Sequence, residues 1–119
     1  FSRETPCRCS TTFRVVTEAI DRYPRLRGIY MANLSVSGCA AAIEQAGKKG
    51  AIRLICHDLN ESVRQLLLRG SIDFTIPQNL RQQGYGPLIL LRDVLRRKAA
   101  PDAARFNRQI DIVCSDNLP

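Results

Sequence analysis

The stretch Leu54–Gln78, LICHDLNESVRQLLLRGSIDFTIPQ, decides the fold because it holds two short apolar runs with a helical segment between them. The runs LIC and FTI are too short for helices and end on polar or Pro-containing sequence, so each is predicted to be a buried strand. Between them, NESVRQLLLRG has apolar residues at helical spacing, with Asn60 as a cap and Gly70 as a stop. Strand, helix and strand in this order predict a crossover between parallel strands.

The same alternation extends through the rest of the chain. Helices are expected from Ser10 to Tyr23 with Ser10 or Thr11 as N-cap, after a cap at Ser35, and from Asn79, where Pro87 should kink the helix or delay its start. We therefore predict the α/β class, with a mostly parallel open sheet and helices on both of its faces. Four strands are expected, at 28–32, 51–56, 72–76 and 109–114, and the second and third contain the runs LIC and FTI.

The composition is that of an ordinary soluble globular chain. Its 119 residues, 45% hydrophobic and 24% charged, suit one compact unit. No apolar run approaches the roughly 20 residues of a membrane helix, so no membrane contact is expected. The N-terminal sequence FSRETPCRCS has neither the apolar region of a signal peptide nor an initiating methionine, which suggests a mature or truncated piece.

The cysteines indicate free thiols and a reducing, cytoplasmic setting, because their number is odd and three lie inside apolar runs. A metal site of Cys7, Cys9 and the single histidine, His57, is disfavoured, since C-x-C is not the usual zinc spacing and no second pair follows. No metal or other cofactor is therefore expected. The five cysteines are Cys7, Cys9, Cys39, Cys56 and Cys114.

The net charge of +7 is dispersed along the chain. Its one dense basic run, LRRK at Leu95–Lys98, lies at the end of a predicted helix, where cations favourably meet the helix dipole. We interpret this run as a solvated helix end in preference to a phosphate-binding patch. Neither a G-x-G-x-x-G motif nor a P-loop is present, so nucleotide chemistry is disfavoured as well.

The candidate site lies where the predicted strands end. In open parallel sheets, ligands bind beyond the carboxyl ends of the strands. Asn33 follows GIYMA, His57 and Asp58 follow RLIC, and Gln78 follows DFTI and a proline. Taken singly, Asn33, Asp58 and Asn60 could be helix caps or turn formers, but matched places after three strands favour a site. A carboxylate between two amides suits a polyhydroxylated small molecule.

Catalysis fits this constellation poorly. No Ser or Cys nucleophile lies beside a base in a recognisable arrangement, and no second carboxylate follows a matching strand. His57 alone does not make a catalytic triad. We therefore do not predict an enzyme.

Three longer stretches resemble a known family: GIYMANLSVSGCAAAIEQAG, IRLICHDLNESVRQLLLRGSIDFTIPQNLRQQGYGPLILLRDVL and the closing IDIVCSDNLP. They resemble the C-terminal part of the periplasmic-binding-protein-like effector domain found in LacI-family (lactose-repressor-type) transcription regulators and in sugar-binding proteins of transport systems. The resemblance runs from Phe13 to Leu118.

This resemblance implies a two-lobed domain that binds a small molecule, often a sugar, between its lobes. It implies that Asn33, Asp58 and Gln78 face the ligand with His57 adjacent, and that Ile76–Gln78 is a hinge crossing. The first lobe and the DNA-binding helix-turn-helix have no counterpart in this sequence, so residues 1–119 are expected to be a single partial domain. Asn33 is followed by leucine where the family often has aspartate, which leaves the ligand open.

We predict the effector-sensing region of a bacterial cytoplasmic transcription regulator. A sugar-like effector would modulate binding to operator DNA through a separate N-terminal domain, and the protein would be a homodimer. The alternative is a periplasmic sugar-binding component of a transport system, and a third hypothesis is a small α/β enzyme. An upstream helix-turn-helix would favour the regulator and an upstream signal peptide the transport component.

Overall fold

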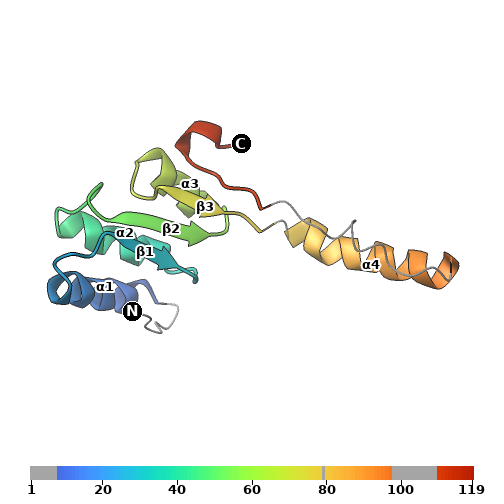
Figure 1. Ribbon diagram of the computed structural model, residues 1–119, viewed down its shortest axis with the longest axis horizontal. Helices are drawn as coiled ribbons and strands as arrows, with labels where there is room; N and C mark the ends of the chain where they lie inside the picture. Colours follow the sequence, from blue (N-terminus) through green and yellow to red (C-terminus); the bar gives the residue numbers. More distant parts are fainter. Residues whose placement is uncertain (1–7, 79, 98–109) are drawn as a thin grey trace. The chain divides into compact units, whose positions relative to one another are not determined.

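A computed structural model of the chain describes residues 8–78, 80–97 and 110–119. Its elements follow in the order α1, β1, α2, β2, α3, β3, α4 and a short 3₁₀ helix (Figure 1). The chain separates into two compact units, residues 1–77 with 112–119 and residues 78–111. The boundary after Pro77 falls within Ile76–Gln78, the segment predicted as a hinge crossing. The assignment of the chain as one partial domain of a two-lobed protein stays a prediction.

The first unit is built around a three-stranded parallel sheet in the order β1-β2-β3. Its register pairs Met31 with Cys56 and Cys56 with Thr75, so the carboxyl ends of the strands finish nearly level. The alternating elements and the parallel pairing confirm the predicted α/β class with a parallel open sheet. The strands are β1 (Gly28–Met31), β2 (Arg53–His57) and β3 (Phe74–Ile76).

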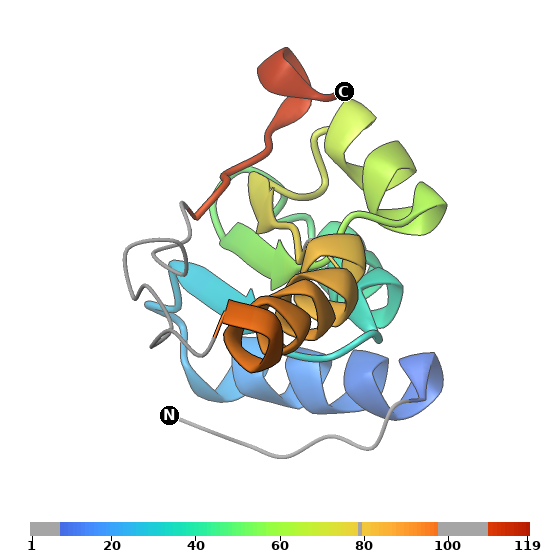
Figure 2. The ribbon, with the colours of Figure 1, turned by 90° about the vertical axis from the view of Figure 1, so that its right-hand side faces the viewer.

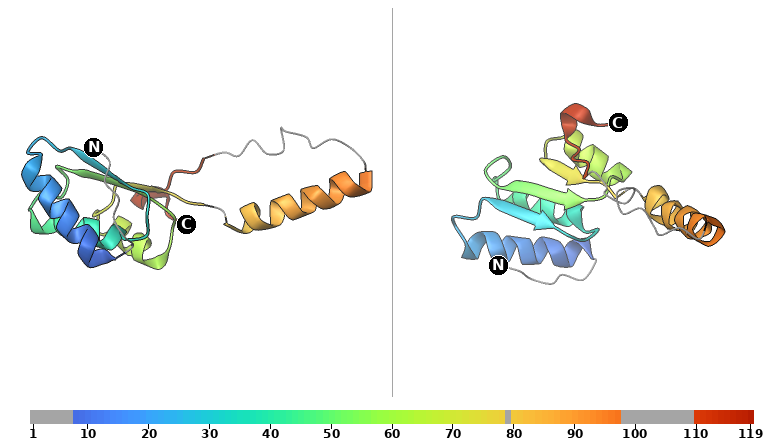
Figure 3. Two further views of the ribbon diagram at one scale, coloured as in Figure 1. Left: turned by 90° about the horizontal axis from the view of Figure 1, so that it is seen from below. Right: turned by 45° about the vertical axis from the view of Figure 1, so that its right-hand side comes forward.

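Three helices lie along one side of this sheet: α1 (Cys9–Arg22), α2 (Val36–Gln45) and α3 (Glu61–Leu68). Figure 2 shows α2 and α3 together on one side of the strands, and the left panel of Figure 3 shows α1 beside α2 on that side. Both crossovers step in the same direction across the sheet, which places α2 and α3 over the same face. Helices were predicted on both faces of the sheet, and the described helices of the first unit cover one of them.

The buried core lies between that face and the three helices. Leu54 and Cys56 point into it from β2, and both are fully buried. Burial of one leucine side chain contributes about 1.5–3 kcal/mol. Apolar side chains of the three helices supply much of the rest: Val16, Ile20, Val36, Cys39, Ala40, Ile43, Val63 and Leu67 are all buried.

The helix ends follow the predicted local signals in two cases and depart from them in one. The Asn60 side chain accepts a hydrogen bond from the backbone N–H of Val63 at 2.9 Å, which confirms its cap. Gly70 follows α3 with φ of 65°, the left-handed conformation expected of a glycine stop. The predicted N-cap at Ser10 or Thr11 is wrong, because α1 already begins at Cys9.

The early start of α1 has a packing reason. The Cys9 backbone approaches α2 so closely that a Cβ on Gly38 would lie 2.3 Å from the Cys9 carbonyl oxygen. The Cys9 thiol also contacts the Ser37 hydroxyl, with 3.2 Å between Sγ and Oγ. These contacts hold the first turn of α1 in place, although no side chain caps it.

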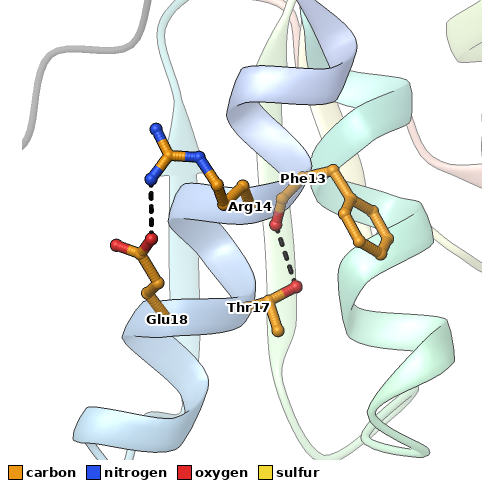
Figure 4. A network of polar contacts seen from close by, with 4 residues as sticks. All are labelled: Phe13, Arg14, Thr17 and Glu18. Carbon is orange, nitrogen blue, oxygen red and sulfur yellow. Dashed lines mark hydrogen bonds and ion pairs between the residues drawn. The ribbon is translucent and has the colours of Figure 1, made fainter.

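Two polar contacts join successive turns of α1 (Figure 4). Arg14 donates a hydrogen bond to the Glu18 carboxylate at 2.7 Å, and both side chains are largely exposed. The Thr17 hydroxyl donates to the Phe13 carbonyl at 2.9 Å. The Arg14–Glu18 pair stabilises the helix by only roughly 0.2–0.5 kcal/mol.

The second unit contains α4 (Leu80–Arg97). The helix begins seven residues before Pro87 and continues through it, so a start delayed to Pro87 is wrong. A proline removes one backbone donor, and the other hydrogen bonds of an 18-residue helix can persist around it. Asn79, the predicted start of this helix, lies outside the described residues. The exposed apolar side chains of α4 include Tyr85, Leu88, Leu91 and Leu95.

The predicted strand at 109–114 is not formed over residues 110–114, which the structure describes. Val113 alone pairs with Thr75, in an antiparallel bridge whose two hydrogen bonds measure 2.8 and 2.9 Å. Pairing ends there because the chain turns at once into the 3₁₀ helix Ser115–Asn117. The Asn117 side chain stabilises that turn by accepting a hydrogen bond from the Cys114 N–H at 2.7 Å.

Candidate functional site

The carboxyl ends of the strands form the edge of the sheet at which the sequence predicted a site. β1 ends at Met31, and Asn33 follows after one residue; β2 ends at His57, and Asp58 follows directly. Parallel pairing of β1 with β2 brings Asn33 and Asp58 to the ends of neighbouring strands. The residues Asn33, Asp58 and Pro77 that follow the three strands are named the carboxyl edge.

Asp58 is held by its backbone, which adopts the left-handed conformation with φ of 66°. Asp tolerates this conformation better than most L-residues. Its N–H donates to the Ile76 carbonyl at 3.1 Å, and its carbonyl accepts from the Thr75 hydroxyl at 2.6 Å. Among the described residues, no hydrogen bond or ion pair involves its carboxylate. The half-buried carboxylate is therefore open to an incoming hydrogen-bond donor.

Asn33 shapes the turn between β1 and α2. Its side-chain oxygen accepts a hydrogen bond from the backbone N–H of Ser35 at 3.0 Å, the contact of an Asx turn. Ser35 occupies the N-cap position of α2 as predicted, but its own side chain makes no cap hydrogen bond. Asn33 thus performs the turn-forming role that the sequence allowed for it, and its contact with a ligand stays a prediction.

His57 departs from its predicted place, because it is the last residue of β2 and not the first residue after it. Leu54 and Cys56 are buried while His57 is half-buried, so its side chain lies on the sheet face opposite the helices. There its Nε2 is hydrogen-bonded to the Tyr30 hydroxyl, and the two rings meet edge-on with centroids 5.3 Å apart. Whether His57 contacts a ligand stays a prediction.

Gln78 is exposed and is the first residue of the second unit. Asn33, His57 and Asp58 lie in the first unit, and Gln78 lies in the second. Two residues with specific contacts at this edge, Tyr30 and Thr75, were missed by the sequence reasoning. Strand alternation and register could have placed Tyr30 on the same face as His57, whereas no local signal marks the contact between Thr75 and Asp58.

The thiols near this edge are unsuited to nucleophilic catalysis. Burial raises the pKa of Cys39 to about 12, and the nearby Cys56 contributes to the increase. Burial also raises the pKa of Cys56, the neighbouring Thr75 side chain lowers it in part, and the Asp58 carboxylate adds to the increase. Thiols that stay protonated at neutral pH are poor nucleophiles.

The described residues contain neither a metal-ligand cluster nor a helix that could span a membrane. Within them, no three His, Cys, Asp or Glu side chains are grouped as the ligands of a metal ion would be. Cys7 of the disfavoured metal site lies outside them. No helix among the described residues is both long enough and apolar enough to cross a membrane.

The sequence of this chain matches the periplasmic binding protein domain family over residues 9–99. The chain belongs to this family. The matched region contains all three strands, so the carboxyl edge lies within it.

The chain is similar in sequence to a curated protein and in fold to solved structures. The D-allose-binding periplasmic protein of Escherichia coli (strain K12) is 31% identical over 80 residues, which are 66% of this chain and 26% of that protein. The glucose-galactose binding protein GanP from Geobacillus stearothermophilus has a TM-score of 0.78 at 18% identity, covering 94% of this chain and 40% of that one. An ABC transporter solute binding protein from Agrobacterium vitis, bound with alpha-D-tagatopyranose, has a TM-score of 0.77 at 26% identity, covering 98% and 39%.

These comparisons confirm the predicted periplasmic-binding-protein-like fold and the resemblance to periplasmic binding proteins. They do not show a lactose-repressor-type regulator, operator DNA binding or a homodimer, which stay predictions. The chain spans 26% of the length of the curated relative and about two fifths of the solved structures described above.

Proposed function

We propose that this chain supplies one ligand-binding edge of a sugar-binding protein, with the Asp58 carboxylate as the principal hydrogen-bond acceptor for the sugar. The observation that carries this proposal is the state of Asp58. Two hydrogen bonds of 2.6 and 3.1 Å fix its backbone, while its carboxylate has no partner among the described residues. An ionised carboxylate only accepts hydrogen bonds, and bonds to charged acceptors are the stronger kind.

The neighbouring side chains extend the same chemistry. Asn33 stands at the next strand end, and an amide can both donate to and accept from sugar hydroxyls. Two further contacts with the sugar are proposed. His57 is the last residue of β2, and Gln78 follows β3 after Pro77. No catalytic step is proposed, since the relatives described above are named as binding proteins and the buried thiols are poor nucleophiles.

Within this function, a component of a transport system is favoured over a transcription regulator. The Agrobacterium vitis relative is an ABC transporter solute binding protein, and the Escherichia coli relative is a D-allose-binding periplasmic protein. The cytoplasmic location, operator DNA and homodimer belong to the regulator hypothesis. A signal peptide or a helix-turn-helix upstream of Phe1 in the full gene product would decide between the two.

The proposal is tested by sugar binding to the longest natural polypeptide that contains this chain. Isothermal titration calorimetry would use D-allose and D-tagatose, which are named for the proteins described above, and D-fucose, which is bound in another solute binding protein from Agrobacterium vitis of similar fold. We expect at least one sugar to bind, and Asp58→Asn to weaken that binding about 10- to 100-fold, because a neutral amide replaces the charged acceptor. Asn suits this substitution because it preserves the side-chain size and tolerates the left-handed backbone.

The matched control is Asp21→Asn, which neutralises an exposed aspartate at the end of α1. Its affinity should equal that of the unmodified protein, and circular dichroism should show both variants folded. The proposed function is contradicted if none of the three sugars binds, or if Asp58→Asn binds as tightly as Asp21→Asn.

A further inference from the structure

Thr75 is a fully buried polar residue at the centre of β3, with 0% of its surface exposed. The residue beside it in the sheet is Cys56, and the surrounding core is apolar. A buried hydroxyl without a partner is destabilising, so a threonine here requires an acceptor. Its Oγ1 lies 2.6 Å from the Asp58 carbonyl oxygen and 3.3 Å from that of Cys56.

The shorter contact takes the single hydroxyl proton. A distance of 2.6 Å is at the short end for a hydroxyl donating to a carbonyl, whereas 3.3 Å is beyond the usual range. The backbone of Thr75 is fixed separately, because its N–H and its carbonyl both bond Val113, at 2.8 and 2.9 Å. Thr75 is thus a rigid donor aimed at the turn that carries Asp58.

We propose that Thr75 is a positioning residue, whose hydroxyl holds Asp58 in the left-handed conformation that presents its carboxylate at the carboxyl edge. The inference rests on the proposed function and adds a residue that acts on ligand binding only through Asp58. Without the hydroxyl, the backbone of Asp58 keeps only the 3.1 Å hydrogen bond from its N–H to Ile76. A left-handed backbone is unfavourable for Asp unless its surroundings impose it.

Loss of the hydroxyl should therefore act on binding through Asp58. A carboxylate that samples several directions must be ordered when the ligand binds, and that ordering lowers the affinity. The competing explanation is that Thr75 only satisfies its own hydroxyl within the core. In that case its removal lowers the stability of the fold and leaves the affinity for sugar unchanged.

The experiment uses the same natural polypeptide and the tightest-binding sugar of the panel D-allose, D-fucose and D-tagatose. Thr75→Val keeps the shape and removes the donor, while Thr75→Ser keeps the donor. We expect Thr75→Val to weaken binding about tenfold and Thr75→Ser about twofold or less, measured well below the melting temperature of each variant. The Asp58 amide should exchange with deuterium faster in Thr75→Val than in Thr75→Ser, with the exchange of Leu54 unchanged.

A double substitution separates the two roles. If Thr75 acts through Asp58, adding Thr75→Val to Asp58→Asn should weaken binding less than it does in the unmodified protein. Unchanged affinity in Thr75→Val, with the loss retained in Asp58→Asn, overturns the positioning role and leaves the proposed function standing. Unchanged affinity in Asp58→Asn overturns the proposed function and this inference with it. Should Thr75→Val fail to fold, Thr75→Cys, whose thiol is a weak donor, replaces it with the same expected direction.

Discussion

Asp58 and Asp73 lie at opposite ends of the same sheet, and the fold uses them in opposite ways. Asp73 precedes β3 at the amino end. One of its carboxylate oxygens accepts the Leu54 N–H at 2.8 Å, and the other pairs with Arg53 at 2.6 Å. Asp58 follows β2 at the carboxyl end, where its backbone atoms are hydrogen-bonded and its carboxylate has no partner among the described residues.

The difference shows how a structural carboxylate is told from a candidate ligand-binding one. Both aspartates border an apolar run, in CHD and in SID, and nothing in those letters separates them. Hydrogen bonds separate them, because the fold occupies the side chain of Asp73 and only the backbone of Asp58. Substitutions at the two sites should accordingly affect different measurements.

The largest effect on stability is expected from Asp73→Ala. The N–H of the fully buried Leu54 would lose its acceptor, which should lower the free energy of unfolding by about 2 kcal/mol. Urea denaturation would measure this loss. The comparison variant is Asp58→Asn, for which we expect a change within about 0.5 kcal/mol. Equal losses in the two variants would contradict the distinction between the two aspartates.

Asn60 tests whether position near the carboxyl edge or a free side chain matters. It lies near that edge, but its side-chain oxygen already accepts a hydrogen bond from the Val63 N–H. Asn60→Ala removes the cap of α3 and should lower the free energy of unfolding by about 1 kcal/mol. The affinity for sugar should stay that of the unmodified protein. Urea denaturation measures the stability of this variant, and calorimetry measures its affinity for sugar. Weaker sugar binding at unchanged stability would contradict the comparison, because a side chain occupied by the fold would then also affect the ligand.

Features of the fold that depend on neighbouring residues were predictable from the sequence. The alternation of helices and strands, the Asn60 cap and the Gly70 stop all follow from patterns within a few residues. Boundaries were less predictable, because contacts with distant segments shift them. The contact of Cys9 with Ser37 accompanies an earlier start of α1.

The positions of the candidate site residues were also predictable from the sequence, but their long-range contacts were not. The strand-end rule placed Asn33 and Asp58 at neighbouring strand ends, as the register has them. It could not give the left-handed backbone of Asp58 or the hydroxyl that holds it, because Thr75 is 17 residues away along the chain. It also could not show that Gln78 belongs to a separate unit.

The smallest effect is expected where an exposed ion pair is broken without disturbing another bond. Arg53 pairs with Asp73 at 2.6 Å and Arg14 pairs with Glu18 at 2.7 Å, and the arginine side chains are 67% and 65% exposed. Arg53→Gln and Arg14→Gln should each lower the free energy of unfolding by about 0.5 kcal/mol or less, a difference that high salt removes. Urea denaturation at low and high salt measures it. If Arg53→Gln lost as much stability as Asp73→Ala, the ion pair and not the Leu54 hydrogen bond would be what makes Asp73 structural.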